Sequence, residues 1–137
     1  MTGNEITLIF ISSFSSGIIG VVISIIYYRK YENRKIRMDT FKKFFSNRYD
    51  LKGDAFSQSL NEIFIVFKNT KPVMEALAQH HNAVTTGKNS EDELVKLFKA
   101  MCKDLRLDID DFNDSFFLKP YNTRPSSTAT NQSNGRY

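Results

Sequence analysis

Two adjacent histidines, one cysteine and an acidic run are the side chains of this sequence best suited to chemistry. His80 and His81 fall in a stretch of helical character, where neighbouring side chains point about 100° apart and cannot bind one metal ion together. No Cys, Asp or Glu follows either histidine at four residues to complete a ligand pair. We therefore expect one half-buried and one exposed histidine, and no metal site.

Cys102 is the single cysteine of the chain, so it has no partner for an internal disulfide. A nucleophilic cysteine needs a base and an accessible, electropositive setting. Cys102 instead lies beside the apolar stripe of its expected helix, and the chain has no histidine other than the adjacent pair. The sequence favours a buried core thiol.

The acidic run from Asp108 to Asp114 has a partial likeness to a calcium-binding loop. An EF-hand loop requires glycine at its sixth position and glutamate at its twelfth, but Asn113 and Lys119 stand there. The run is typical of an acidic cap on a short helix. Because phosphate-binding loops, H-E-x-x-H and nucleophile elbows are also missing, we expect no enzyme, no cofactor and no small-molecule substrate.

Ile6–Tyr28 is a run of 23 residues without a single charge. About 20 apolar residues suffice to cross the hydrocarbon core of a bilayer, and a lone span of this kind must be helical. The first five residues carry no basic side chain, and Arg29 and Lys30 directly follow the run. These features argue against a cleaved signal peptide and predict an uncleaved transmembrane helix.

The net charge of +4 is concentrated just after this run. Residues 29–48 hold eight basic and two acidic side chains, whereas residues 49–137 hold eleven basic and twelve acidic ones. A basic flank is typical of the cytoplasmic side, so we expect a single-pass protein of the cell inner membrane, with residues 1–5 outside. The near-neutral distal part argues against nucleic-acid binding. The predicted contacts with anionic lipid are Arg29, Lys30, Arg34, Lys35 and Arg37.

Small side chains recur along one side of the predicted span. A spacing of four residues aligns them on one helix face, where they let a second helix approach closely. We interpret the face as a site of self-association or of docking to a partner's transmembrane helix; alternatively, each serine bonds its own backbone. The predicted interface consists of Ser12, Ser13, Ser16, Gly17, Gly20 and Ser24.

Residues 29–48 continue without Pro or Gly and predict a basic juxtamembrane helix. Its apolar stripe either lies on the membrane surface or forms part of a core, and the core interpretation is favoured because later helices need a packing partner. The stripe comprises Met38, Phe41, Phe44 and Phe45.

Residues 49–121 predict a small, all-α cytoplasmic domain. The first expected helix, from about 54 to 68, has Asp54 as its cap and an apolar stripe of Phe56, Leu60, Ile63, Phe64 and Phe67. The next begins at Thr70, with Pro72 in its first turn, and runs to about 84. A capping box of Ser90 and Glu93 opens another, and a last turn begins near Asp108. The polar tail, 122–137, is expected to be disordered.

From residue 30 to residue 121 the sequence resembles an uncharacterised family of small bacterial proteins. The resemblance rests on Arg37-x-x-x-Phe41-x-x-Phe44-x-x-x-Arg48, on Leu60-Asn61-x-Ile63-x-x-x-Phe67, on Val73-x-x-Ala76 and on the closing Phe116–Tyr121 stretch. It implies a hydrophobic N-terminal helix followed by a cytoplasmic helical domain, and it implies no activity. It also draws attention to Arg48 and Asn61. We expect Arg48 to bond Asn61 or Glu62 and so fix how two helices cross, with a partner-recognition patch as the alternative.

The function that the sequence favours is a membrane-anchored interaction or adaptor protein, which self-associates or docks a membrane protein partner. Its expected contacts are therefore membrane lipid and either a second copy or another membrane protein. The alternative is a small membrane-permeabilising effector, toxin-like or holin-like, that assembles through the same span. A third, weaker hypothesis is an anionic-lipid sensor that works through residues 29–48.

Overall fold

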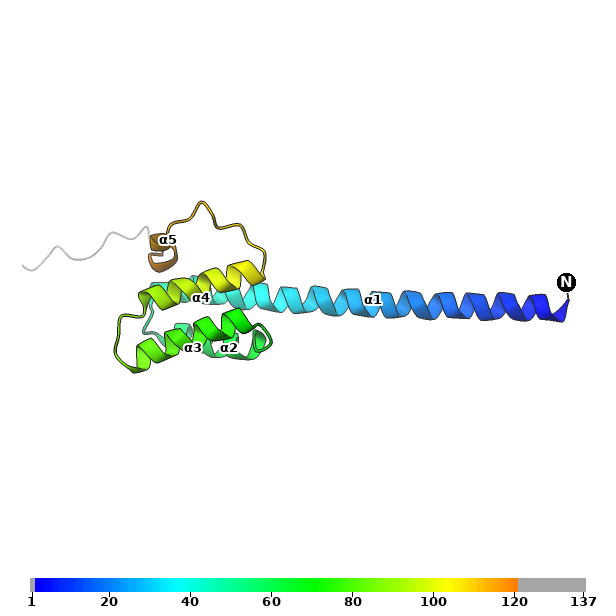
Figure 1. The fold of residues 1–137 in the computed structure, drawn as a ribbon, viewed down its shortest axis with the longest axis horizontal. Helices are drawn as coiled ribbons and strands as arrows, with labels where there is room; N and C mark the ends of the chain where they lie inside the picture. Colours follow the sequence, from blue (N-terminus) through cyan, green and yellow to red (C-terminus); the bar gives the residue numbers. More distant parts are fainter. Residues whose placement is uncertain (1, 121–137) are drawn as a thin grey trace, which may run out of the picture.

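The computed structural model describes residues 2–120, which form one long helix ending in a small helical bundle (Figure 1). No strand occurs among these residues, so the all-α prediction is confirmed for them. The predicted tail, 122–137, lies outside the described residues. The elements in chain order are α1 (Gly3–Ser46), the 3₁₀ helix η1 (Asn47–Tyr49), α2 (Asp54–Val66), α3 (Lys71–Thr85), α4 (Glu91–Asp104) and α5 (Asp114–Leu118).

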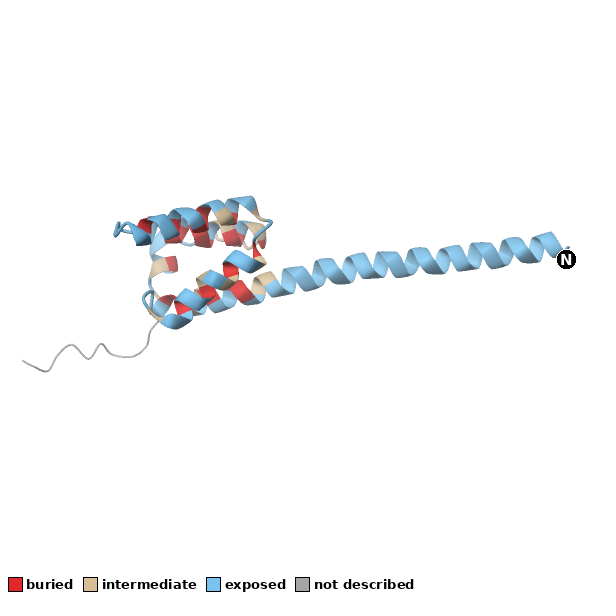
Figure 2. Cartoon of the chain, turned by 90° about the horizontal axis from the view of Figure 1, so that it is seen from below, coloured by how far each residue is buried: buried red, intermediate tan, exposed pale blue. Residues whose placement is uncertain are grey.

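Helix α1 has 44 residues, which at 1.5 Å per residue makes it about 66 Å long. Every residue from Thr2 to Ile36 is exposed, so the apolar run touches nothing else in the described chain (Figure 2). By length and composition, α1 is able to cross a membrane. The predicted span and the predicted juxtamembrane helix, as far as Ser46, are therefore one continuous helix, and residues 47 and 48 belong to η1.

The four main helices run alternately up and down, with α2 returning along α1 and α4 returning along α3 (Figure 1). The principal pairs are α1 with α2 and α3 with α4. The α2–α3 connection and the C-terminal end of α4 lie at the end of the bundle from which α1 emerges. The α3–α4 loop and α5 lie at the opposite end.

Phe44 is the centre of the bundle core and is fully buried. Its ring centroid lies 5.1 Å from that of Phe56 in α2 and 4.5 Å from that of Phe98 in α4. Phe98 in turn stacks on Phe117 of α5 at 5.9 Å. Stacked aromatic pairs add about 0.5–1.5 kcal/mol each to the burial term. The interpretation of the stripe on α1 as core is therefore confirmed, because Phe41 is buried as well.

Polar contacts fix the crossing of α1 and α2. Glu62 of α2 accepts hydrogen bonds from the Thr40 hydroxyl at 2.9 Å and from the Lys43 ammonium at 2.8 Å. These bonds, Lys43 first, lower the pKa of the Glu62 carboxyl. One turn further on, the Asn47 amide donates to the Ser59 hydroxyl at 3.1 Å. The bonds come from the last turns of α1 and from the first residue of η1, so they define the register of α1 and α2.

The predicted caps of α2 and α4 differ from the structure. Asp54 is the first residue of α2, and Gly53 occupies the N-cap, where a Cβ would collide with the Asp50 carboxylate. Ser90 is the N-cap of α4 but makes no side-chain capping bond. The Asn89 side chain accepts from the Glu91 N–H instead, at 3.1 Å.

The last helix also begins later than expected. Asp108 lies in an irregular segment, and α5 starts only at Asp114. Its cap is Asn113, whose side-chain oxygen accepts from the Phe116 N–H at 3.1 Å. An amide thus replaces the acidic cap, while Asp114 still favours the positive end of the helix.

The central position of Phe44 makes it the most sensitive residue of the bundle. We expect Phe44→Ala to lower the free energy of unfolding by about 3–5 kcal/mol, because it removes a ring that is packed between α2 and α4. The measurement is urea denaturation of the full-length protein in detergent, in which proteolysis of the bundle reports the unfolded fraction at each urea concentration.

The matched control is Phe64→Ala, since Phe64 lies on α2 but is 60% exposed. Its loss should stay below about 1 kcal/mol. An equal loss from both variants would contradict the central role of Phe44.

Candidate functional site

The sequence predicts one half-buried and one exposed histidine; in the structure His81 is exposed, and His80 is buried more deeply than predicted. Burial lowers the pKa of His80, the neighbouring His81 lowers it further, and the Glu93 carboxylate opposes the shift. Among residues 2–120, no group of three His, Cys, Asp or Glu side chains is close enough to hold a metal ion.

Cys102 is a buried core thiol, which confirms the prediction. Desolvation raises its pKa to about 11. The thiolate, which is the reactive form of cysteine, is therefore scarce at neutral pH. The position of Cys102 on the inner face of α4 suits packing and gives it no route to an external substrate.

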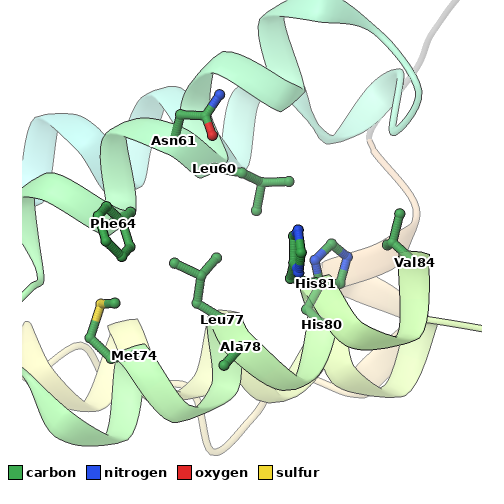
Figure 3. A pocket seen from close by; sticks show the side chains of 9 residues that line it. All are labelled: Leu60, Asn61, Phe64, Met74, Leu77, Ala78, His80, His81 and Val84. Carbon is green, nitrogen blue, oxygen red and sulfur yellow. The ribbon is translucent and has the colours of Figure 1, made fainter. Parts of the chain in front are cut away.

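An apolar groove of about 430 Å³ opens between α2 and α3 (Figure 3). Leu60 and Phe64 of α2 face Met74 and Leu77 of α3 across it, and His80 and His81 lie toward one end. No Asp, Glu, Lys or Arg lines the groove. The lining residues are Leu60, Asn61, Phe64, Met74, Leu77, Ala78, His80, His81 and Val84.

The groove exists because α3 packs mainly against α4 and makes only limited contact with α2. Phe64 was expected in the buried stripe of α2, but its side chain is 60% exposed and lies on the groove. Helical spacing correctly places Phe64 beside Leu60 and Phe67. It does not reveal that α3 makes only limited contact with α2, so the expected burial of Phe64 is wrong.

Arg48 does not form the predicted bond. Its guanidinium donates to the Phe45 carbonyl at 2.7 Å and lies 3.7 Å from the centre of the Phe45 ring. Within residues 2–120, no hydrogen bond joins Arg48 to Asn61 or Glu62, and Asn61 instead lies at the edge of the groove. The side chain is buried, and burial lowers the pKa of Arg48. The helix crossing is fixed one residue earlier, by Asn47.

The small-residue face of α1 is exposed throughout. The Ser12 hydroxyl donates to the Ile9 carbonyl at 2.9 Å, so this serine bonds its own backbone. A hollow of about 350 Å³ lies on the helix surface at Ser13, Gly17 and Val21. A Cβ at Gly17 or Gly20 would meet no atom within 4 Å. The fold of one chain therefore does not require glycine at either position.

The five predicted lipid contacts separate into two groups. Lys30, Arg34 and Arg37 line a cavity between α1 and the C-terminal end of α4. Arg37 forms an ion pair with Asp104 of α4 at 3.0 Å, and the Arg34 guanidinium donates to the Leu105 carbonyl at 3.2 Å. Arg29 and Lys35 are exposed and do not line this cavity.

The described residues thus define a class of protein in which an apolar helix, long enough to span a membrane, carries an α-helical bundle built on its own last turns. The chain belongs to the family of unknown function DUF6680, whose model matches residues 1–117. The resemblance to an uncharacterised family is thereby confirmed. No curated protein and no solved structure matches the chain.

Burial of neutral His80 predicts a loss of stability in mild acid. The pKa of His80 is lowered from 6.5 in the folded state, so the unfolded chain binds the proton first. The free energy of unfolding should therefore fall as the pH drops below about 6.5, by at most about 1.4 kcal/mol per pH unit. Urea denaturation between pH 8 and pH 5 measures this dependence.

In the variant His80→Gln the dependence should flatten, whereas His81→Gln should retain it because His81 is exposed. The range ends at pH 5, above the region in which Glu62 takes up a proton. A wild-type profile that is level from pH 8 to pH 5 would refute the assignment.

Proposed function

We propose that this protein is a single-pass, membrane-anchored adaptor that self-associates through its span and presents its bundle to a partner protein. In this proposal the bundle is cytoplasmic and the short N-terminus lies across the membrane, because the basic residues follow the span. The proposal includes no enzymatic reaction. The observation that carries it is the continuity of α1 from the apolar run into the bundle core.

That continuity favours an adaptor because it removes any flexible linker between membrane and bundle. The last turns of α1 supply Phe41 and Phe44 to the core, so the bundle cannot separate from the helix without unfolding. A partner bound to the bundle would therefore be held at a fixed distance from the membrane. Neither the buried thiol of Cys102 nor the pair of His80, which is buried, and His81, which is exposed, supports a catalytic alternative.

Self-association is supported by the two glycines of the span. Each glycine costs a helix about 1 kcal/mol relative to alanine, and no neighbouring group within the chain benefits from the missing side chain. In bilayers, small residues permit close packing of helices. The hollow at Gly17 offers a place for a side chain of a second α1.

Substitution of the glycines tests self-association directly. We expect Gly17→Ile or Gly20→Ile to reduce the dimer fraction several-fold in cross-linking experiments on membranes, because the added side chain separates the helices. Folding should be unaffected, since a Cβ at either position meets no other atom.

Ser15→Ile is the matched control, because Ser15 is equally small and lies outside the predicted face. It should leave the dimer fraction unchanged. A protein that stays monomeric in every variant, wild type included, would refute this part of the proposal.

For the partner we propose a helix with an apolar face, bound in the groove between α2 and α3. The groove lining lacks full charges, which suits an apolar surface better than a charged peptide. It extends along α3 from Met74 to Val84, about 15 Å or three helical turns. Recognition of an amphipathic helix in such a groove relies on apolar anchors at helical spacing.

A photo-reactive phenylalanine analogue at Phe64 of the membrane-embedded protein tests the occupant. We expect a discrete adduct whose cross-linked peptide, sequenced by mass spectrometry, belongs to another protein and has an apolar helical face. The same analogue at Tyr49, which is 68% exposed but outside the groove, should give none. An adduct with lipid or with a second copy would contradict the proposed occupant.

A further inference from the structure

A basic cavity lies where α1 enters the bundle, between α1 and the end of α4. Its volume is about 470 Å³. Four cationic side chains and one carboxylate line it, which leaves a formal charge of +3. The lining residues are Lys30, Asn33, Arg34, Arg37, Asp104, Leu105 and Arg106.

Two contacts hold the walls of this cavity in place. Arg37 donates to both oxygens of Asp104, at 3.2 and 3.0 Å, and Arg34 uses one N–H group to reach the Leu105 carbonyl. A guanidinium has five N–H groups, so Arg34 retains donors for another ligand. Among residues 2–120, Lys30, Arg34 and Arg106 form no ion pair with a carboxylate.

Arg106 stands at a position that ordinarily suits glycine. Its φ is 54°, the single positive φ among the non-glycine residues 2–120. The Arg106 N–H bonds the Lys103 carbonyl at 3.1 Å and the Leu107 N–H bonds the Cys102 carbonyl at 2.9 Å, which is the Schellman ending of a helix. An arginine is less favourable than glycine in this conformation, because its Cβ approaches the following carbonyl oxygen. Backbone strain of this kind is concentrated at functional sites.

The cavity begins directly after the apolar run, because Lys30 is among its lining residues. This step rests on the proposed membrane span of residues 6–28. Lys30 follows Tyr28 by two residues and Arg34 by six, so they lie about 3 and about 9 Å beyond the apolar run. The headgroup layer on each side of a bilayer is about 5–7 Å thick. Lys30 then lies within this layer, and Arg34 lies about 2 Å beyond it, where its long side chain can still reach a phosphate.

We propose that this cavity binds the phosphate group of an anionic phospholipid, with Lys30, Arg34 and Arg106 as its donors. The first two come from α1 and the third directly follows the end of α4, so the site is complete only while α4 is docked on α1. A bound headgroup then stabilises the docked bundle by mass action. An anionic lipid is thus a structural ligand of the folded domain, and not only a counter-charge for the basic residues after the span.

The variant Arg106→Gly tests the site without disturbing the fold. Glycine is the preferred residue in this conformation, so thermal stability without lipid should be equal to or higher than that of the wild type. Binding of dioctanoyl-phosphatidylglycerol to the full-length, delipidated protein in detergent should weaken five- to tenfold, as about 1 kcal/mol per basic residue implies. Native mass spectrometry measures the bound lipid.

Three controls make the result decisive. Lys88→Ala removes an exposed cation near the α3–α4 loop, at the far end of the bundle, and should leave binding unchanged. Dioctanoyl-phosphatidylcholine should bind more weakly than phosphatidylglycerol, because the net positive lining repels its choline group. Inorganic phosphate should not compete at millimolar concentration, and full competition would replace the lipid by a free anion as the ligand.

Failure of this site and failure of the membrane proposal give different results. If carbonate extraction releases the wild-type protein from membranes, the anchor itself is wrong. If the protein resists extraction but Arg106→Gly binds phosphatidylglycerol as tightly as the wild type, the anchor stands and the headgroup site is refuted.

Discussion

The packing of Phe44 between α2 and α4 is the interaction on which the rest of the structure depends. Because Phe44 belongs to α1, the bundle is assembled around the end of the same helix that carries the apolar run. A separate domain joined by a loop would bury its own helices and leave α1 free. Here, by contrast, the fold of the bundle and the orientation of α1 are established together.

Hydropathy and helical periodicity predict most of this architecture. The helical charge-free run, the core stripe at the end of α1 and the buried thiol of Cys102 all agree with the structure, since each depends on residues within one helix. Pro72 in the first turn of α3 also agrees, because its backbone role is local. The family model likewise matches the part of the chain that contains these helices.

What the sequence did not reveal depends on contacts between helices. Phe64 has the spacing of a core residue but lies on an open groove, because α3 prefers α4 as its neighbour. Arg48 was expected to reach across to α2, yet the tight turn of η1 folds it back over Phe45. No motif or spacing in the sequence points to Arg106. Its proposed role depends on a positive φ and on Arg34, which lines the same cavity.

The unbroken geometry of α1 has a further consequence for direction. Each residue of an α-helix adds about 1.5 Å of length and about 100° of rotation. The stretch between Tyr28 and Arg37 therefore sets the distance of the bundle from the apolar run. It also sets the direction, around the axis of α1, in which the groove faces. If two copies associated through one face of α1, their grooves would face in fixed directions relative to each other. Insertion or deletion of one residue in this stretch would therefore shift the bundle by about 1.5 Å along α1 and turn all of its surfaces by about 100° around the helix axis.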